Sequence, residues 1–539
     1  MSRNTIALVA GVVGLCVVVV VVFGGGTALS ADLDSPPTLI IEATSLGLSS
    51  EETAEQLAVP LERAAAGLTG LHRIESQSDF GGRCVLSITF KEGTDLDAAK
   101  SQLRTKVEPA LAGLSDEVRK SIEIRDESPA ALMVVTLDSP ERRIDVGELY
   151  DYAEKQLKTL LVQTVGVAAV RTYGRPGSKI DPDLDLIQYR PGEVIKSTAV
   201  ADAAGFARSG DRPLVALYVY GKSQASRGDV GGAVKKQLEE LRAGLPQGMT
   251  LDVAFDRTTE VAAMSCFVVE MIASDDYGNG LPHDAATVAD MFKREPGFLS
   301  PVVLSHCPVE CRRFLRNRLY VAIRLTPEQR TVEERLDKLK IVLTAMRYAM
   351  GPNKLVYESP ARGVRGASSI VRVGVKGPAG TDEKAVERAA GEFASIVSHY
   401  RTLLTFDDAP DGRGSVDRIT LDPKKAARYG IAPEAFVEAA RARMVSNFEN
   451  QRTKLPTPLS ELRLAVDGAE KITVAKVTTT ESRNGPAIVR RVDGEPIFEL
   501  RFGFNPTIAQ AEIRKEIEMA AAKQLPPGFS FVWITDRPE

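Results

Sequence analysis

LPQGMTLDVAFDR, at Leu245–Arg257, returns 280 residues later as LPPGFSFVWITDR, at Leu525–Arg537. Each copy closes a half of the chain in which stretches typical of strands alternate with stretches typical of helices. A repeat of this length is too long for a solenoid, whose units recur roughly every 20 to 50 residues. The sequence therefore predicts a duplicated body with two related lobes.

The first half opens with a pattern typical of a small sheet that carries helices on one face. An apolar strand at 38–43 is followed by Ser49 and Glu52, which are spaced as the capping box that begins a helix. The further elements expected in this first βαββα run are a helix at 54–68, a hairpin around Gly81-Gly82 and a helix at 96–111. Residues 121–125 supply either its last strand or the start of the next unit. This order is the split βαβ arrangement.

The same alternation continues through the rest of the chain. A second βαβ run covers 131–173, and a strand, a helix and a strand at 214–255 close the first half. Residues 175–191 are rich in Pro, Gly and Asp and predict a linker, whereas 258–318 show no strong period and predict an irregular insert. In the second half we expect strands at 319–325, 370–375 and 403–406 and helices at 331–350 and 382–398.

Length, charge and cysteine content narrow the function classes. A chain of 539 residues exceeds one hydrophobic core and implies several domains. Its 68 basic and 72 acidic residues are nearly balanced and form no block, so nothing points to nucleic acid, which favours a basic face. The five cysteines are too few and too scattered for a disulfide-framed secreted domain.

The N-terminus carries a targeting segment. Ile6–Phe23 is an unbroken run of 18 apolar or glycine residues preceded by Arg3, which is nearly long enough to span a bilayer as a helix. The small residues at 26–31 keep a cleavable signal peptide open as the alternative to an uncleaved anchor. In both cases we expect the body outside the cytoplasm. The later run Cys266–Ala273 is short and carries Glu270, so it predicts a buried helix or strand rather than a membrane span.

A longer series of residues resembles a known family. In the first half the matching residues are Pro60-Leu-Glu62, Gly67, Gly70, Ile74, Ser76, Ser78, Gly81-Gly82, Phe90, Gly93-Thr-Asp95, Ala98 and Ser128–Val135. In the second half they are Leu421–Phe436, Gly485–Arg490 and Asp493-Gly494. This ordered series resembles the periplasmic part of the resistance-nodulation-division (RND) efflux permeases.

The resemblance implies an α+β fold with duplicated βαβ, ferredoxin-like porter subdomains in two lobes and one N-terminal transmembrane helix. In the first half, the domain boundaries that follow from it are 1–31 for the anchor or signal segment and 36–125 and 126–257 for two porter subdomains, of which the second has a reduced docking region. The insert covers 258–318. In the second half, the porter subdomains cover 319–410, a docking-like subdomain covers 411–490, and the closing strand, helix and strand cover 491–539.

The resemblance also implies partners: a homotrimer or an assembly with RND permease subunits, a membrane-fusion adaptor, an outer-membrane channel and hydrophobic small-molecule substrates. Two departures limit this transfer. Family members carry a block of five membrane helices after each lobe, one with a proton-relay pair of aspartates, whereas Asp275-Asp276 of this chain precedes a glycine-rich turn. The first lobe also lacks a counterpart of Leu421–Phe436, which makes the channel the less secure partner.

Few residues suggest chemistry. His306, Cys307 and Cys311 form the one cluster of metal-like types, and its alternatives are no ligand, an oxidised cysteine pair or a metal. No nucleophile, phosphate-loop or zinc-protease motif is present, so we expect no catalytic residues, no cofactor and no enzyme. Apolar candidates for lining a cleft, each also explained by core packing, are Met133, Phe206, Tyr218, Phe502 and Phe504.

These observations give one leading hypothesis and one alternative. The leading one is a periplasmic body of an RND-type efflux assembly, anchored in the inner membrane by one N-terminal helix, which binds substrates or docks adaptors without its own proton relay. The alternative is a periplasmic scaffold or binding protein that derives from an RND permease and does not transport. The sequence identifies no substrate-binding residues for either.

Overall fold

A computed structural model describes most of the body of the protein. It covers residues 36–45, 47–110, 114, 116–128, 130–174, 186–190, 192–197, 207–210, 212–258, 266–272, 289–294, 297–299, 301–306, 318–324, 326, 354–358, 369–378, 380–397, 403–407, 413–438, 440, 463–464, 472–504 and 510–534. The expected anchor at 6–23, Asp275-Asp276 and the expected helix at 331–350 lie outside these ranges. Within them, no helix has the length and apolar character needed to cross a membrane.

The fold is α+β, as expected, and its first part is a four-stranded antiparallel unit, here unit 1. Its strands lie in the order β4-β1-β3-β2. The chain order is strand, helix, two strands, helix and strand, which is the split βαβ connection. The bounds are β1 Thr38–Thr44, α2 Ser50–Thr53, η1 Ala54–Ala58, α3 Val59–Ala65, β2 Leu71–Asp79, β3 Arg83–Phe90, α4 Leu96–Ala110, α5 Asp116–Lys120 and β4 Glu123–Asp126.

The strand order of unit 1 recurs in the second part of the first half, here unit 2. Its strands lie in the order β11-β5-β10-β6, so the fourth strand again neighbours the first and the first neighbours the third. The bounds are β5 Met133–Asp138, α6 Val146–Tyr152, η2 Ala153–Leu157, α7 Lys158–Val162, β6 Val167–Tyr173, β10 Arg212–Gly221, α8 Arg227–Ala243 and β11 Thr250–Asp256. The expected elements at 131–173 and 214–255 are confirmed.

A third stretch, here unit 3, repeats the order as β15-β12-β14-β13. Its bounds are β12 Cys266–Ile272, β13 Val302–Leu304, β14 Arg318–Arg324 and β15 Lys354–Glu358, with helical residues 289–294 between β12 and β13. Two of these strands lie within 258–318, so the prediction of an irregular insert is wrong there. The expectation that Cys266–Ala273 is a strand or buried helix is confirmed by β12.

A fourth stretch, here unit 4, closes the chain with the order β24-β16-β23-β17. Its bounds are β16 Ser369–Lys376, α11 Glu383–Val397, β17 Leu403–Asp407, β23 Glu495–Phe504, α15 Gln510–Gln524 and β24 Ser530–Trp533. Strand β22, Ile488–Val492, forms a hairpin with β23, and the turn between them uses positive φ at Asp493 (49°) and Gly494 (86°). Such turns match the twist of paired strands.

The two halves of the chain share their sheets crosswise. Strand β22 of the second half pairs with β2 of unit 1, so units 1 and 4 form one nine-stranded sheet. Reciprocally, β9 (Ala207–Ser209) of the first half pairs with β13 of unit 3, so units 2 and 3 form the other. At the contact between β2 and β22, buried Glu62 accepts hydrogen bonds from Ser76 Oγ (2.5 Å) and Arg491 Nε (3.1 Å). Neither half therefore completes a sheet alone.

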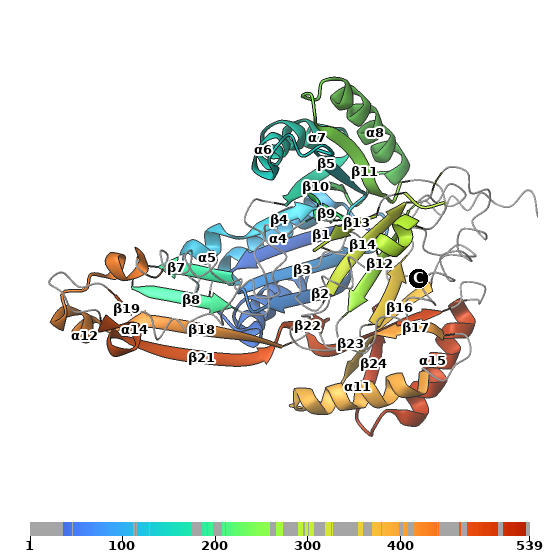
Figure 1. The fold of residues 1–539 in the computed structure, drawn as a ribbon. Helices are drawn as coiled ribbons and strands as arrows, with labels where there is room; N and C mark the ends of the chain where they lie inside the picture. The colour runs from blue at the N-terminus through green and yellow to red at the C-terminus, as the bar shows by residue number, and fades with distance from the viewer. Residues whose placement is uncertain are drawn as a thin grey trace, which may run out of the picture.

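A projecting arm also draws on both halves (Figure 1). Its antiparallel sheet has the order β21-β18-β8-β7, and α12 and α14 lie towards its far end. The bounds are β7 Leu186–Arg190, β8 Glu193–Ser197, β18 Arg413–Leu421, α12 Pro423–Arg428, β19 Arg463–Leu464, β20 Ile472–Thr473, α14 Val474–Val477 and β21 Thr478–Pro486. Because β7 lies within 175–191, the prediction of a linker is wrong at that strand.

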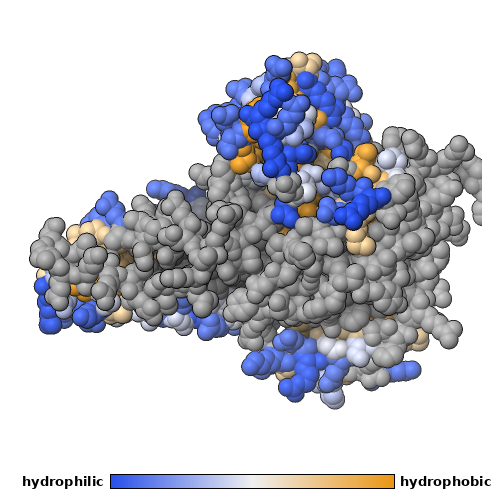
Figure 2. All heavy atoms as spheres, viewed as in Figure 1, coloured by the Kyte–Doolittle hydropathy of each residue, from blue (hydrophilic) through white to orange (hydrophobic). Residues whose placement is uncertain are grey.

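The helices cover one face of each sheet, as the periodicity predicts. Ser49 and Glu52 form the expected capping box, with reciprocal hydrogen bonds of 3.2 and 2.9 Å. Leu57, Leu61 and Leu103 from the helices of unit 1 pack on its sheet, and α6, α7 and α8 cover unit 2 in the same way. Figure 2 shows mainly hydrophilic residues on the outward side of the unit 2 helices.

The link between units 2 and 3 is short. β11 ends at Asp256 and β12 begins at Cys266, which leaves nine residues between them. One helix across a bilayer needs about 20 residues. The membrane block that the resemblance places after the first lobe therefore has no room at this junction.

Candidate functional site

The helix-free face of unit 2 is apolar and rich in tyrosine. Along β10, Val215, Leu217 and Val219 pack under the helices, whereas Tyr218 and Tyr220 point to the other face. That alternation is the period of two of a strand whose faces meet different neighbours. The side chains that share this second face, from units 2 and 3, are Ala131, Val134, Ala207, Leu214, Ala216, Tyr218, Tyr220, Ala254, Phe255, Val268, Val302, Leu304, Tyr320 and Ala322, here the tyrosine face.

Three rings at the tyrosine face contact one another. The ring of half-buried Tyr173 stacks on His306 with centroids 3.9 Å apart and meets the Tyr218 ring edge-on at 4.8 Å. The Tyr218 hydroxyl donates a hydrogen bond to the His306 carbonyl oxygen (2.8 Å), and His306 Nδ1 lies 2.8 Å from Ser305 Oγ. The result is a largely buried cluster of rings whose polar groups are hydrogen-bonded to one another.

An ion pair joins β11, the outer strand of unit 2, to β14 of unit 3. β11 contacts β12 and β14 as well as its sheet partner β5, so the sheet of units 2 and 3 curls back on itself. Asp252 on β11 binds Arg324 on β14 through both oxygens, at 2.8 and 2.6 Å. Burial raises the pKa of Asp252, but the hydrogen bond and charge of Arg324 outweigh it and lower that pKa overall. We call this pair the clasp.

Gly174 holds the chain next to the ring cluster in a conformation that other residues avoid. Its φ is +106°, and a Cβ added there would lie 2.5 Å from the Leu214 carbonyl oxygen. We expect Gly174→Ala to lower the free energy of unfolding by about 2 kcal/mol or more, since it adds both backbone strain and a clash. Gly210→Ala is the matched control, because φ is +61° there but no atom lies within 4 Å. Equal melting points for the two variants would refute this assignment.

The residues singled out in the sequence do not form one site. Met133 and Phe502 lie in different helix-covered cores, and of the candidates whose side chains the structure describes, Tyr218 and His306 reach the tyrosine face or its rim. Phe206, Cys307 and Cys311 lie outside the described residues, and no side-chain position is described for Phe504. Within the described part of the chain, no group of three His, Cys, Asp or Glu side chains is placed to hold a metal ion.

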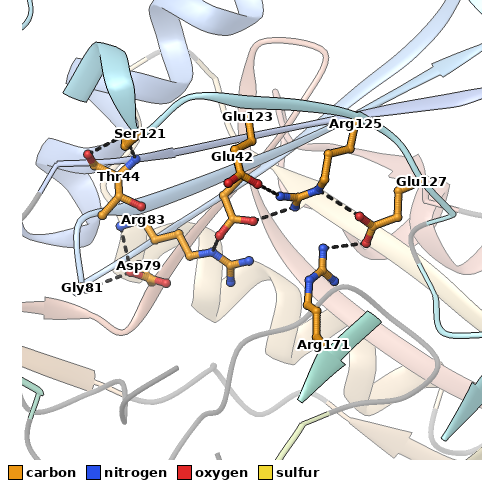
Figure 3. Close-up of polar contacts among 10 residues, drawn as sticks. All are labelled: Glu42, Thr44, Asp79, Gly81, Arg83, Ser121, Glu123, Arg125, Glu127 and Arg171. Carbon is orange, nitrogen blue, oxygen red and sulfur yellow. Dashed lines mark hydrogen bonds and ion pairs between the residues drawn. The ribbon is translucent and has the colours of Figure 1, made fainter. Parts of the chain in front are cut away.

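A charged junction joins units 1 and 2 (Figure 3). Glu127, whose side chain is 1% exposed, binds Arg125 Nε at 2.9 Å and Arg171 Nη2 at 2.6 Å. Arg125 continues to Glu42 at 2.7 Å, and Glu42 also pairs with Arg83. The chain of ion pairs thus runs from β1 and β3 through β4 to β6. Sequence reasoning missed it, since its members are far apart in sequence and show no local spacing signal.

Glu42 should make the stability of the protein depend on pH. Burial alone raises the pKa of Glu42, but the charges and hydrogen bonds of Arg83 and Arg125 hold it well below its ordinary value of 4.5. A carboxylate with a depressed folded-state pKa stabilises the fold above its unfolded pKa, and this contribution is lost as the pH falls. Unfolding midpoints at pH 6, 5, 4 and 3.5 should therefore fall, and Glu42→Gln should remove about 1 kcal/mol of that dependence. An unchanged pH slope in the variant would contradict the assignment.

The comparisons with known proteins agree on one family. Residues 12–190 match the model of the AcrB/AcrD/AcrF family. Multidrug resistance protein MdtF of Escherichia coli (strain K12) is 26% identical over 216 residues, which are 39% of this chain and 19% of the relative. Multidrug resistance protein MdtC of Erwinia tasmaniensis is 24% identical over 290 residues, covering 42% of this chain and 28% of the relative.

A third relative is a transporter by its printed name. The toluene efflux pump membrane transporter TtgB of Pseudomonas putida is 26% identical over 172 residues, which are 31% of this chain and 16% of the relative. The matches thus span between 16 and 28% of the length of these three relatives. The match to the family model, together with these relatives, relates the chain to the resistance-nodulation-division efflux permeases.

Proposed function

We propose that this chain is a periplasmic porter body of an RND-type efflux assembly. The crosswise pairing of its halves is the observation that carries the proposal. Four units with one strand order share two sheets, and the helix-free faces of units 2 and 3 belong to the same curved sheet. A face that lies between two units can be exposed and covered again if one unit turns against the other as a rigid body. The units are, in this proposal, duplicated ferredoxin-like porter subdomains.

The substrates we propose are amphipathic or hydrophobic small molecules that contact the tyrosine face. Tyr173, at its rim, is half-buried, whereas Tyr218 and Tyr320 are about 1% exposed. Entry therefore requires β11 and β14 to separate, which means that the Asp252–Arg324 clasp opens. The relatives' printed names include multidrug resistance and toluene efflux, and both fit an apolar site lined by rings.

The energy for transport comes, in this proposal, from another subunit. Between units 2 and 3 the nine-residue link has no room for a membrane helix, and ionisable groups that drive transport belong among such helices. We therefore place the body in the periplasm, held by the N-terminal segment at 6–23, and propose a homotrimer or an assembly with permease subunits. A membrane-fusion adaptor and an outer-membrane channel complete the proposed assembly, and no catalytic step is assigned.

The test is a tolerance assay in cells. We expect deletion of the gene to sensitise cells to hydrophobic dyes and detergents, and the full chain on a plasmid to restore tolerance. Asp252→Asn with Arg324→Gln opens the clasp and should change the tolerance profile, whereas Glu141→Gln with Arg143→Gln, an exposed ion pair of the same kind, should not. An unchanged profile after deletion, combined with altered envelope integrity, would refute the efflux role and favour the non-transport scaffold.

A further inference from the structure

Among the described residues, the arm sheet has two outer edges of opposite kind, and they suggest how copies of the chain assemble. Its sheet order is β21-β18-β8-β7, so β21 and β7 are the outer strands. Among the described residues no strand pairs with the outer side of either one. Figure 1 shows the two strands on opposite sides of the arm. An outer strand offers a row of backbone donors and acceptors to a further strand.

The arm is built from two hairpins that occupy equivalent places in the duplicated fold. β7–β8 lies between the second and third strands of unit 2, and β18–β21 lies between the second and third strands of unit 4. Inside the chain, the second strand of the first hairpin, β8, pairs with the first strand of the other, β18. The two outer strands of the arm sheet are β7, the first strand of the β7–β8 pair, and β21, the second strand of the β18–β21 pair. They can therefore repeat the same contact, but only between copies.

The directions of the strands allow that contact. β21, β18, β8 and β7 alternate in direction, because every neighbouring pair is antiparallel. A second arm placed beside the first, in the same orientation, brings its β7 antiparallel to β21. A contact between two unlike edges is heterologous, and a series of such contacts closes into a ring when the rotation permits.

β21 is an outer strand whose residues are mostly exposed. Residues 479–484, six of the nine residues of the strand, are exposed although β18 pairs with all of it. Its end is nevertheless fixed to unit 1, since Ser50 Oγ donates to the Pro486 carbonyl oxygen (2.6 Å) and Arg483 pairs with Glu52. The edge is thus held in place on the body and remains accessible along about six residues.

We propose that β21 of one copy pairs with β7 of the next copy, so that the arms close the proposed trimer into a ring. The occupant of each edge is a second copy of this chain, since the same type of edge pairing already occurs inside it. The inference rests on the proposed homotrimer and goes beyond it by naming the strands. The ring would contain the four arm strands of each copy in one continuous antiparallel sheet.

Engineered disulfides test this pairing in the full chain. The register places Ile187, Lys196, Asp417 and Ser482 in one row across the sheet. We therefore pair Ile187→Cys with Thr480→Cys, Ser482→Cys or Asn484→Cys, positions of the same face that allow for a shift of register. Inside one copy β7 and β21 are three strand spacings apart, about 14 Å, which is too far for a disulfide. Any bridge between them is intermolecular.

Mild oxidation should give covalent oligomers up to three chains for at least one of these pairs, with the linked peptides identified by mass spectrometry. Ile187→Cys with Glu481→Cys, one residue out of phase on β21, should give about tenfold less product. Native Cys84 is fully buried and is kept, and the other four native cysteines, Cys16, Cys266, Cys307 and Cys311, are replaced by serine in every variant. A disulfide between two copies of the single variant Ser482→Cys would indicate a two-fold contact and would overturn the proposal. A monomer in native mass spectrometry, or a strand of another protein bound to β21, would overturn it as well.

The outcome is separable from that of the efflux role. Cross-linked rings together with unchanged tolerance after gene deletion would refute the proposed function and keep the strand pairing. Loss of tolerance on deletion together with no β7–β21 bridge would keep the function and refute the pairing.

Discussion

Replacing Glu127 by alanine should lower the free energy of unfolding by about 3 kcal/mol, among the largest effects of any single substitution in this protein. Glu127 is buried between Arg125 and Arg171, which approach it at 2.9 and 2.6 Å. Its removal takes away the one carboxylate that binds both guanidinium groups, while Arg125 keeps its ion pairs with Glu42 and Glu123. Arg171 also lies over the Tyr220 ring at 4.3 Å, so the disturbance extends into unit 2.

Thermal unfolding and hydrogen exchange of the full chain measure this effect. Exchange should rise most in β4 and β6, because these strands carry the arginines. Glu123→Ala is the matched control, since that glutamate also pairs with Arg125 but is 63% exposed, where an ion pair contributes less than about 1 kcal/mol. Equal destabilisation by the two variants would show that the junction does not depend on the buried carboxylate.

Replacing Phe80 by alanine should loosen the arm from unit 1. Phe80 is fully buried at the tip of the β2–β3 hairpin and packs with Ile195 and Val416 of the arm sheet and with Ala487 and Ile488. Its backbone N–H also donates to the Ala487 carbonyl oxygen (3.3 Å). Truncation of a buried phenylalanine leaves a cavity and costs about 3–5 kcal/mol. The loss should fall on the contact between the arm and the body.

Hydrogen exchange distinguishes this local effect from a general loss of stability. In Phe80→Ala, exchange should rise in β8 and β18 and stay unchanged in α8 of unit 2. Phe502→Ala makes a cavity of the same kind in the core of unit 4 and should act on β16 and β23 instead. Phe80→Leu should restore much of the protection. A Phe80→Ala profile that matches that of Phe502→Ala would contradict the role assigned to Phe80.

The parts of the fold that follow from local signals were predictable. The capping box at Ser49 and the hairpin at Gly81-Gly82 are local chemistry, and both are present. The strands and helices of unit 2 keep a clear period because each has one covered face. The resemblance to the RND permeases is carried by an ordered series of short motifs in both halves of the chain. The family model matches residues 12–190, which lie in the first half.

Other parts could not be predicted because their signal is not local. β13 has three residues, too few to show a period, and the five residues of β7, LIQYR, do not alternate strictly between apolar and polar. The crosswise pairing of β2 with β22 and of β9 with β13 joins residues far apart in sequence, and alternation within a strand does not name its neighbour.

The candidate site was predictable only in part. Tyr218 was a candidate for its ring, and His306 for its imidazole, but no spacing relates them to Tyr173. Asp252 lies in the repeated closing stretch, and its partner Arg324 is 72 residues away. The repeat identifies the strand that carries Asp252, whereas the ion pair depends on the curl of the sheet.

The crosswise sharing of the two sheets is tested most directly by cutting the chain in the link between β11 and β12. Residues 1–260 and 261–539, expressed together, should copurify in a one-to-one complex with the hydrogen-exchange protection of the intact chain at β2, β22, β9 and β13. Each half expressed alone should show reduced protection at those strands, because each of them has one sheet neighbour in its own half and loses the other neighbour, which is on the other half. Two halves that fold separately with these strands fully protected, and that do not bind each other, would contradict the account.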